Sequence, residues 1–567
     1  MKKASVIRIA ILTVVLTVLA VFLKEIGIPW LTEPNETRKA RQLLGRILAT
    51  HPQTAASTET RAAPLRPDEF VLATRQLIQL GHDAVPPLIE ILRDDNLAVV
   101  RLGIEYITQI GRPAVPDLIP LLHEAPPTAR VAAAEALGRI RDRKALDDLI
   151  AALSDASLIV RGAAVYAVSG MPDERAALPT AELLKDPNAE LKRVACSALR
   201  IMGDERVVNV LIEATSDDEP GVREAAALAL GEIADARARD PLIALLRDSN
   251  ENVRYAAAVA LGAVPDATAT EPLLKALKDP YPPVRRAAAR TLGRIGSPQT
   301  AAALMEALAD TKAAPPFRSS GTDRTEPAAA SAAEALGKLK AKEAVEPLLK
   351  LARSPDPGIH RAAIIALGKI AGPKAPPILL ECLRNRADGT IVAAAIALGR
   401  IADPESAPKV EKVAETPGSY LTHLACDYVL YKLGQEDKLR ALLPEPEQAS
   451  RTVSVERARL LAEIDKPEVV AALADGIGEK ESEEAAACAE ALGQIGTDTA
   501  TAELVKALAR LESPALRCAV IRALANIGTP AALEAISRAV EDKAFFVRRE
   551  AKRALRIAQT QRQEKSP

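Results

Sequence analysis

Aromatic residues are scarce in this chain of 567 residues, which has one Trp, seven Tyr and five Phe. So few rings exclude a base-stacking platform for single-stranded nucleic acid and an aromatic-lined substrate cleft. An excess of one charge sign is also lacking, because 74 Lys and Arg stand against 75 Asp and Glu. This balance gives no electrostatic footprint for a polyanion, so we expect no nucleic-acid partner.

Cysteine and histidine are equally sparse, with five of each. The cysteines show neither metal-ligand spacing nor a disulfide framework, and we interpret them as small buried residues on helices. No Gly-rich phosphate loop, nucleophile elbow or zinc-binding helix motif occurs. The sequence therefore indicates no catalytic residue, no cofactor and no metal site.

A repeat occupies most of the chain. The phrase Leu-Gly-x-(Ile/Val) recurs at Leu230, Leu261 and Leu292, each 31 residues after the last. Sixteen such anchor positions keep one register from Leu77 to Leu555, with one long step of 44 residues between Leu292 and Leu336. A fixed period in this range is the signature of a solenoid.

Each repeat is predicted to be a helical hairpin. The apolar residues from Val222 to Ile233 follow the spacing of one face of an α-helix, and a second apolar helix follows at 239–246. The abundant Ala residues favour helix formation and allow close packing. One hairpin cannot bury its apolar face, but a stack of hairpins can.

Charges are also periodic, because an acidic residue precedes a basic one by six positions in many repeats. We interpret these residues as a structural ladder through neighbouring turns; clear examples are Asp155 with Arg161, Asp217 with Arg223, Asp248 with Arg254, and Asp279 with Arg285.

The phrase Val-Arg-x-x-Ala-Ala-x-Ala-Leu-Gly-x-Ile, followed by Pro-Leu-(Ile/Leu)-x-x-Leu, closely resembles HEAT repeats of the phycobilisome-lyase-like subtype. The resemblance covers roughly Asp68 to Ala558. It implies an all-α superhelix of about 16 units with a concave binding face, and most such proteins are scaffolds or adaptors. An enzyme or enzyme subunit of the phycobilin-lyase type is the alternative that the resemblance raises.

The N-terminal segment 1–30 is predicted to be a membrane anchor or a signal. An uncharged run from Ile9 to Leu23 lies between Arg8 and Lys24, and Trp30 follows. We expect a single-pass protein with its N-terminus inside and its solenoid extracytoplasmic; secretion after cleavage is the alternative. The other predicted segments are a linker (31–67), the solenoid (68–558) and a disordered tail (559–567).

Two surface rows and one loop are candidates for binding a partner protein. A basic ridge is predicted near the ends of successive helices at Arg294, Lys338, Lys369, Arg400 and Lys432, with Arg290 beside it. An acidic partner would fit this ridge, although helix C-termini also favour cations by themselves. An apolar stripe would include Tyr166 and Tyr428, or these residues are half-buried between repeats. The long step implies an insertion loop at 311–327 that carries Phe317.

Arginine and lysine are dense in the last repeat, which we interpret as the polar outer face of a terminal cap; these residues are Arg548, Arg549, Lys552, Arg553 and Arg556. The sequence as a whole predicts a membrane-anchored scaffold that binds proteins without catalysis.

Overall fold

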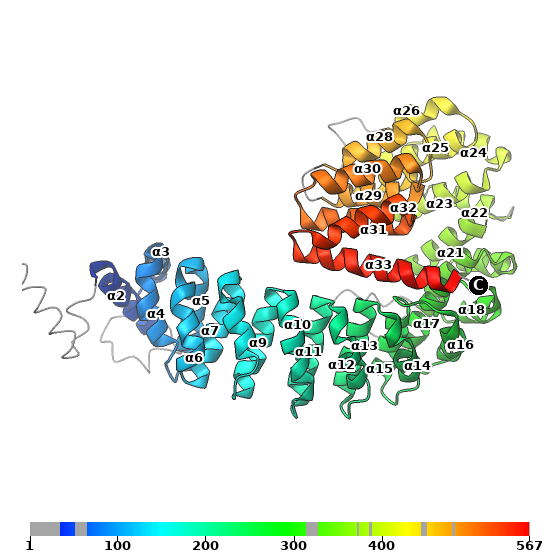
Figure 1. Ribbon diagram of the computed structural model, residues 1–567. Coiled ribbons are helices and arrows are strands. Elements are labelled where there is room, and N and C mark those ends of the chain that lie inside the picture. Colours follow the sequence, from blue (N-terminus) through cyan, green and yellow to red (C-terminus); the bar gives the residue numbers. More distant parts are fainter. Residues whose placement is uncertain are drawn as a thin grey trace, which may run out of the picture. The chain divides into compact units, whose positions relative to one another are not determined.

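The computed structural model of the chain describes residues 34–50, 65–312, 327–370, 374–384, 388–443, 451–478 and 482–565 (Figure 1). Within these ranges the regular structure is helical throughout. The chain divides into two compact units, residues 1–198 and 199–567, which are described separately below. The predicted all-α solenoid is confirmed.

The N-terminal unit contains α2 (Asn35–Thr50), α3 (Pro67–Gln79), α4 (Val85–Ile91), α5 (Leu97–Ile110), α6 (Val115–Glu124), α7 (Pro127–Ile140), α8 (Leu146–Ala152), α9 (Leu158–Gly170), α10 (Glu174–Glu182) and most of α11 (Ala189–Met202).

The C-terminal unit continues with α12 (Val208–Ala214), α13 (Pro220–Ile233), α14 (Arg239–Leu245), α15 (Glu251–Leu261), α16 (Thr270–Ala276), α17 (Pro282–Ile295), α18 (Ala301–Ala307), α19 (Ala328–Leu339), α20 (Val345–Leu351), α21 (Pro357–Ile370), α22 (Pro376–Cys382), α23 (Asp388–Ile401), α24 (Ala407–Ala414), α25 (Tyr420–Lys432), α26 (Leu439–Leu442), α27 (Arg451–Leu461), α28 (Pro467–Gly476), α29 (Glu483–Ile495), α30 (Asp498–Arg510), α31 (Pro514–Ile527), α32 (Pro530–Arg538) and α33 (Phe545–Lys565).

Each of the repeat positions found in the sequence lies in an odd-numbered helix from α3 to α33, and we call these the anchor helices. Many of them end at a short 3-10 turn that leads into the next helix. The turns η6 (Glu205–Val207) and η7 (Ala236–Ala238) begin at Asp204 and Asp235, whose carboxylates each accept a hydrogen bond of 2.9 Å from the N–H two residues later. This capping fixes the direction of the return helix.

Close contact between successive anchor helices explains the glycine of the Leu-Gly phrase. A methyl group placed on Gly231 of α13 would lie 2.7 Å from the Cα of Ala260 of α15. Non-bonded carbon atoms sit roughly 3.5–4.0 Å apart, so only glycine fits there. Gly337 and Gly368 lie in the same way against Ala366 and Ala397. Glycine on one helix and alanine on the next therefore set the stacking distance.

Tyr428 departs from this pattern. Beside Gly399 it occupies the place that Ala397 occupies beside Gly368, and its ring covers the glycine. The side chain is fully buried, so Tyr428 is not available to a partner, contrary to the predicted apolar stripe. The step from Leu398 to Leu430 is 32 residues rather than 31, so counting from Leu430 gives Tyr428 an outward position that its burial rules out.

The acidic and basic residues of the turns form a ladder between repeats. Arg223 donates two hydrogen bonds, of 2.7 and 2.9 Å, to the carboxylate of Asp248 in the next repeat. A third bond of 2.8 Å goes to the backbone carbonyl of Asp217, six residues earlier. Arg254 makes the same contacts with the Asp279 carboxylate and the Asp248 carbonyl, and the N-terminal unit contains the pair Arg130–Asp155.

Burial acts to raise the pKa of Asp248, but the hydrogen bonds from Arg223 and from the N–H of Asn250 outweigh it and hold the pKa below the usual range. The balance is the same at Asp155, where Arg130 and the N–H of Ser157 are the donors. These carboxylates are therefore charged and paired near neutral pH.

The helix α2 lies within the predicted linker, where the sequence also allows one short helix at 36–49, and its apolar side chains, including Leu44 and Ile47, are buried. The helix α33 continues to Lys565, through most of the predicted disordered tail. The predicted membrane localisation is corrected, because no described helix is long and apolar enough to cross a bilayer. The segment 1–30, on which that prediction rested, lies outside the described residues.

Candidate functional site

The predicted basic ridge lies on consecutive anchor helices of the C-terminal unit. Arg290 and Arg294 are on α17, and Lys338, Lys369, Arg400 and Lys432 follow on α19, α21, α23 and α25. The pKa of Lys369 is lowered, first by partial burial and then by the like charges of Lys338 and Arg400. The carboxylates of Glu334 and Glu463 act on the same ammonium in the opposite direction, and the net effect is a lowered pKa.

The two ends of the ridge differ in their partners. Arg400 forms a bidentate ion pair with Glu463, with nitrogen–oxygen distances of 3.0 and 2.7 Å. The ammonium of Lys432 lies 3.3 Å from the backbone oxygen of the same residue. Arg290, Arg294, Lys338 and Lys369 form no ion pair with any carboxylate of the described residues. This second group, which we call the unpaired ridge, can receive an external anion.

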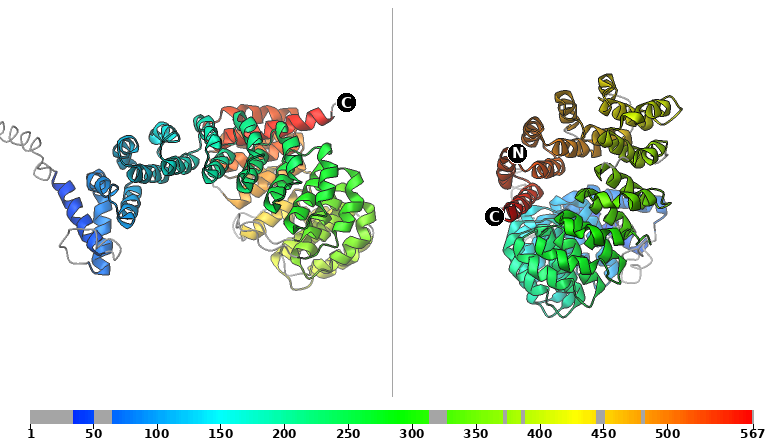
Figure 2. Two further views of the ribbon diagram at one scale, coloured as in Figure 1. Left: turned by 90° about the horizontal axis from the view of Figure 1, so that it is seen from below. Right: turned by 90° about the vertical axis from the view of Figure 1, so that its right-hand side faces the viewer.

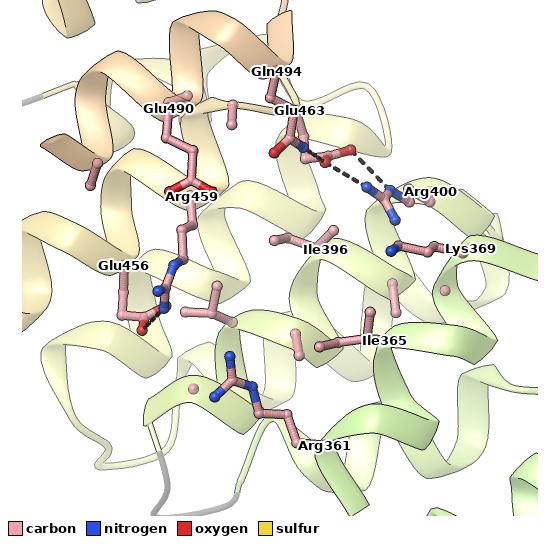
Figure 3. Close-up of a pocket in the computed structure, with 18 residues that line it drawn as sticks. Arg361, Ile365, Lys369, Ile396, Arg400, Glu456, Arg459, Glu463, Glu490 and Gln494 are labelled. Carbon is pink, nitrogen blue, oxygen red and sulfur yellow. Dashed lines mark hydrogen bonds and ion pairs between the residues drawn. The ribbon is translucent and has the colours of Figure 1, made fainter. Parts of the chain in front are cut away.

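A pocket of about 210 Å³ opens beside the unpaired ridge (Figure 3). Its lining comes from α21, α23, α27, α29 and the turn after α27, with Ile365 and Ile396 among its apolar residues. Arg361 and Lys369 point toward the open space from α21, and Glu490 faces it from α29 (Figure 3). The pocket therefore joins an apolar surface to cations without a bound carboxylate.

Two internal ion pairs lie at the pocket edge. Glu456 accepts from Arg459 within α27, and Glu463 is held by Arg400 and by the side chain of Gln494. These ion pairs neutralise most of the carboxylates that line the pocket. The cations and apolar side chains that remain in the lining favour a ligand that has both an aliphatic group and a carboxylate.

Sequence reasoning missed the residues that α27 and α29 contribute. The repeat pattern predicts contacts between successive anchor helices, but α23 also packs directly against α27, which is two anchor helices further on. Nothing in the period indicates this contact. The missed residues are Glu456 and Arg459 of α27, Glu463 in the turn after it, Glu490 and Gln494 of α29, and also Arg361 of α21.

Two further candidates come from the sequence, an exposed aromatic residue and a loop. Tyr166 is 67 % exposed on α9 of the N-terminal unit. Phe317 and most of the insertion loop 311–327 lie outside the described residues. The thiols of the C-terminal unit are poor nucleophiles, because burial raises the pKa of Cys382 and Cys518 to about 11. No group of His, Cys, Asp and Glu among the described residues has the arrangement of a metal site.

Comparison with known protein families identifies the repeat. The sequence matches the HEAT repeat family at residues 115–180, 177–251, 239–322, 315–396 and 501–565, which together exceed half of the chain. The chain is a HEAT-repeat protein. Residues 485–510 also match the PBS lyase HEAT-like repeat, so the resemblance seen in the sequence is confirmed.

Similarity to individual proteins is lower. No curated protein matches the sequence significantly. The HEAT-repeat chain resembles importin beta at 12% identity and a TM-score of 0.49, over 95% of this chain and 97% of that one. It resembles the karyopherin Kap121p bound to the C-terminus of Cdc14p at 13% identity and a TM-score of 0.45, over 96% and 77%.

A third similar structure is the complex of CpcE and CpcF of phycocyanin lyase from Nostoc sp. PCC7120. Its identity is 21% and its TM-score 0.29, over 46% of this chain and 93% of that one. Nothing about the partners of the present HEAT-repeat protein follows from similarities at this level.

Proposed function

We propose that this HEAT-repeat protein is a non-catalytic scaffold that binds an acidic segment of a partner protein on the inner face of its C-terminal unit. The inner face means the unpaired ridge together with the adjacent pocket. The observation that carries the proposal is the set of neighbouring cations, from Arg290 to Lys369, that no described carboxylate pairs with.

The physical reason is electrostatic complementarity. Lys369 is half-buried and close to two other cations, so a bound carboxylate would relieve their repulsion. The neighbouring Ile365 and Ile396 are half-buried and would give an aliphatic side chain of the same segment a place to bind. A segment with both groups would use both parts of the inner face.

Affinity capture with the full chain tests the proposal. The first bait is wild type, and the second carries Arg294→Glu, Lys338→Glu and Lys369→Glu. A matched control carries Lys342→Glu, Lys350→Glu and Arg353→Glu, which make the same charge change at exposed residues in and beside α20. A captured protein is then purified and titrated against each form.

We expect wild type and control to bind the partner alike and the ridge variant to bind at least tenfold more weakly, which corresponds to about 1.4 kcal/mol. Lys338→Glu and Lys369→Glu should change the free energy of unfolding by less than about 1 kcal/mol, because neither lysine forms an ion pair among the described residues. Arg294→Glu also removes the hydrogen bond to the Gly262 carbonyl and should cost about 0.5–1.5 kcal/mol more. Equal binding by all three forms would contradict the proposal.

A further inference from the structure

The superhelix of the C-terminal unit brings together helices that are far apart in the repeat order (Figure 1, Figure 2). At the end of the chain, Arg549 of α33 forms an ion pair with Glu232 of α13, and the side chain of Arg556 is only 11% exposed. The last repeat is therefore not the solvated cap that its arginines suggested. A second contact of this kind, between α23 and α27, lies at the pocket beside the ridge.

The carboxylate of Glu463, in the turn after α27, is fully engaged at this second contact. Arg400 of α23 donates two hydrogen bonds to it, and the side-chain amide of Gln494 on α29 donates a third. The Glu463 side chain is only 13% exposed. A guanidinium fork and an amide N–H around one carboxylate form a strong recognition site for that group. Here the chain itself supplies the carboxylate.

The backbone of Glu463 is held independently of its side chain. Its N–H donates to the carbonyl of Leu460 at 3.2 Å, and its carbonyl accepts from the ammonium of Lys432 at 3.3 Å. Neither bond involves the carboxylate, and Glu463 lies in a turn rather than within α27. The side chain can therefore rotate away from Arg400 while the turn stays in place.

Arg400 occupies the ridge position next to Lys369. The two residues lie on successive anchor helices, and both line the pocket together with Glu463 and Gln494 (Figure 3). The donors that hold the Glu463 carboxylate are thus part of the same pocket surface as the unpaired ridge. An acidic segment with one carboxylate on Lys369 would bring its next acidic side chain toward Arg400.

We infer that Arg400 and Gln494 form a further carboxylate subsite of the inner face, that Glu463 occupies this subsite as an internal competitor, and that a second carboxylate of the bound acidic segment takes its place. The inference rests on the proposed function and extends the binding site beyond Lys369. In the wild type one carboxylate replaces another, so the subsite adds little affinity. Without the Glu463 charge, the segment gains the whole contact.

Peptide affinity in the full chain is the first test. The probe is a peptide of alternating Glu and Leu, and the same peptide with Gln in place of Glu is its control. Glu463→Gln should bind the acidic peptide at least about fivefold more tightly than wild type and should not change binding of the Gln peptide. Adding Arg400→Ala to Glu463→Gln should abolish the gain, because the subsite then lacks its guanidinium.

Two matched variants separate occupancy of the subsite from a general change of charge. Glu490→Gln removes an exposed carboxylate that faces the same pocket but leaves Arg400 paired, and it should strengthen binding by less than about twofold. Glu512→Gln removes an exposed carboxylate between α30 and α31 and should leave the affinity unchanged. An equal gain from Glu463→Gln and Glu490→Gln would contradict the inference.

Chemical rescue is the second test, and it requires no peptide. Glu463→Ala removes the atoms of an acetate ion from the subsite, so added acetate should bind there and raise the unfolding temperature of this variant. Acetamide, which has the same shape without the charge, should not raise it. Acetate should not stabilise wild type, whose subsite is occupied. Equal effects of acetate on both proteins would show that the subsite does not accept an external carboxylate.

The peptide experiment distinguishes the inference from the proposed function. If wild type and Glu463→Gln bind the acidic peptide equally, the inference is wrong, and the unpaired ridge with its pocket stays the proposed site. If neither form binds the acidic peptide, the proposed function fails, and the inference about its ligand fails with it.

Discussion

Arginine and lysine form two rows in the C-terminal unit, and the rows differ in what their charged groups contact. In the ladder, Arg223 and Arg254 each lie between a carboxylate of the next repeat and a carbonyl of their own turn. On the ridge, Lys338 and Lys369 have no described carboxylate as a partner. A periodic cation is thus not informative by itself; the acceptors around it separate a structural role from a binding role.

Acid should cause the largest loss of stability, because it protonates the carboxylates of the ladder together. Asp155 and Asp248 have pKa values below the usual Asp value of about 3.9. Their stabilisation is complete above that value and is lost as the pH falls through the lower, folded-state values. Thermal unfolding at pH values from about 6 to 2 should show a steep loss of stability only below about pH 4.

The ridge gives the contrasting expectation. The ridge variant of the capture experiment should lose stability with acid along the same curve as wild type, since it leaves the ladder intact. A shallower curve in this variant would show that the ridge cations take part in folding and would remove the contrast.

The loss of a single arginine–aspartate pair of the ladder should have the next largest effect on stability. Asp248→Ala leaves Arg223 without its carboxylate at a site where the arginine side chain is 14% exposed. We expect a loss of about 2–4 kcal/mol in the free energy of unfolding, measured by urea denaturation. Asp240→Ala, an exposed change on α14, is the control and should cost less than about 0.5 kcal/mol. Equal effects would mean that the rung is not stabilising.

The smallest effect should come from the paired end of the ridge. Arg400→Ala removes the bidentate contact to Glu463 and should cost about 1 kcal/mol of stability, with less than about twofold change in partner affinity. Lys369→Ala should do the reverse, weakening partner binding without loss of stability. Unfolding curves and titrations of these two variants measure both quantities. The same pattern in both variants would refute the distinction between paired and unpaired cations.

Much of the fold could be predicted from the sequence, because its determinants are local. Every repeat position from Leu77 to Leu555 lies in an anchor helix, since apolar spacing within a helix and a fixed period require only short-range regularity. The ladder residues were visible for the same reason. Their partners were not: the spacing of six describes the contact of Arg223 with the Asp217 carbonyl, whereas the carboxylate comes from Asp248 in the next repeat.

The site was predictable only in part. The ridge residues share one helical position, so their alignment follows from the period. The pairing of Arg400 with Glu463 and of Arg549 with Glu232 depends on how far the superhelix turns. That turn accumulates over many repeats from small differences in packing, and no short-range pattern in the chain records it.

The contact of glycine with alanine between anchor helices also determines what a ligand of the ridge must look like. Helix axes lie about 8–10 Å apart, and contacts such as Gly337 with Ala366 and Gly368 with Ala397 favour the short end of that range. Gly293 meets Ala335 in the same way, so Arg294, Lys338 and Lys369 recur at nearly this spacing. An extended peptide rises about 3.3 Å per residue. A segment bound along the ridge would therefore need an acidic residue at every second or third position to contact successive cations. In this way the Gly–Ala contacts between helices would determine the spacing of acidic residues in the proposed partner.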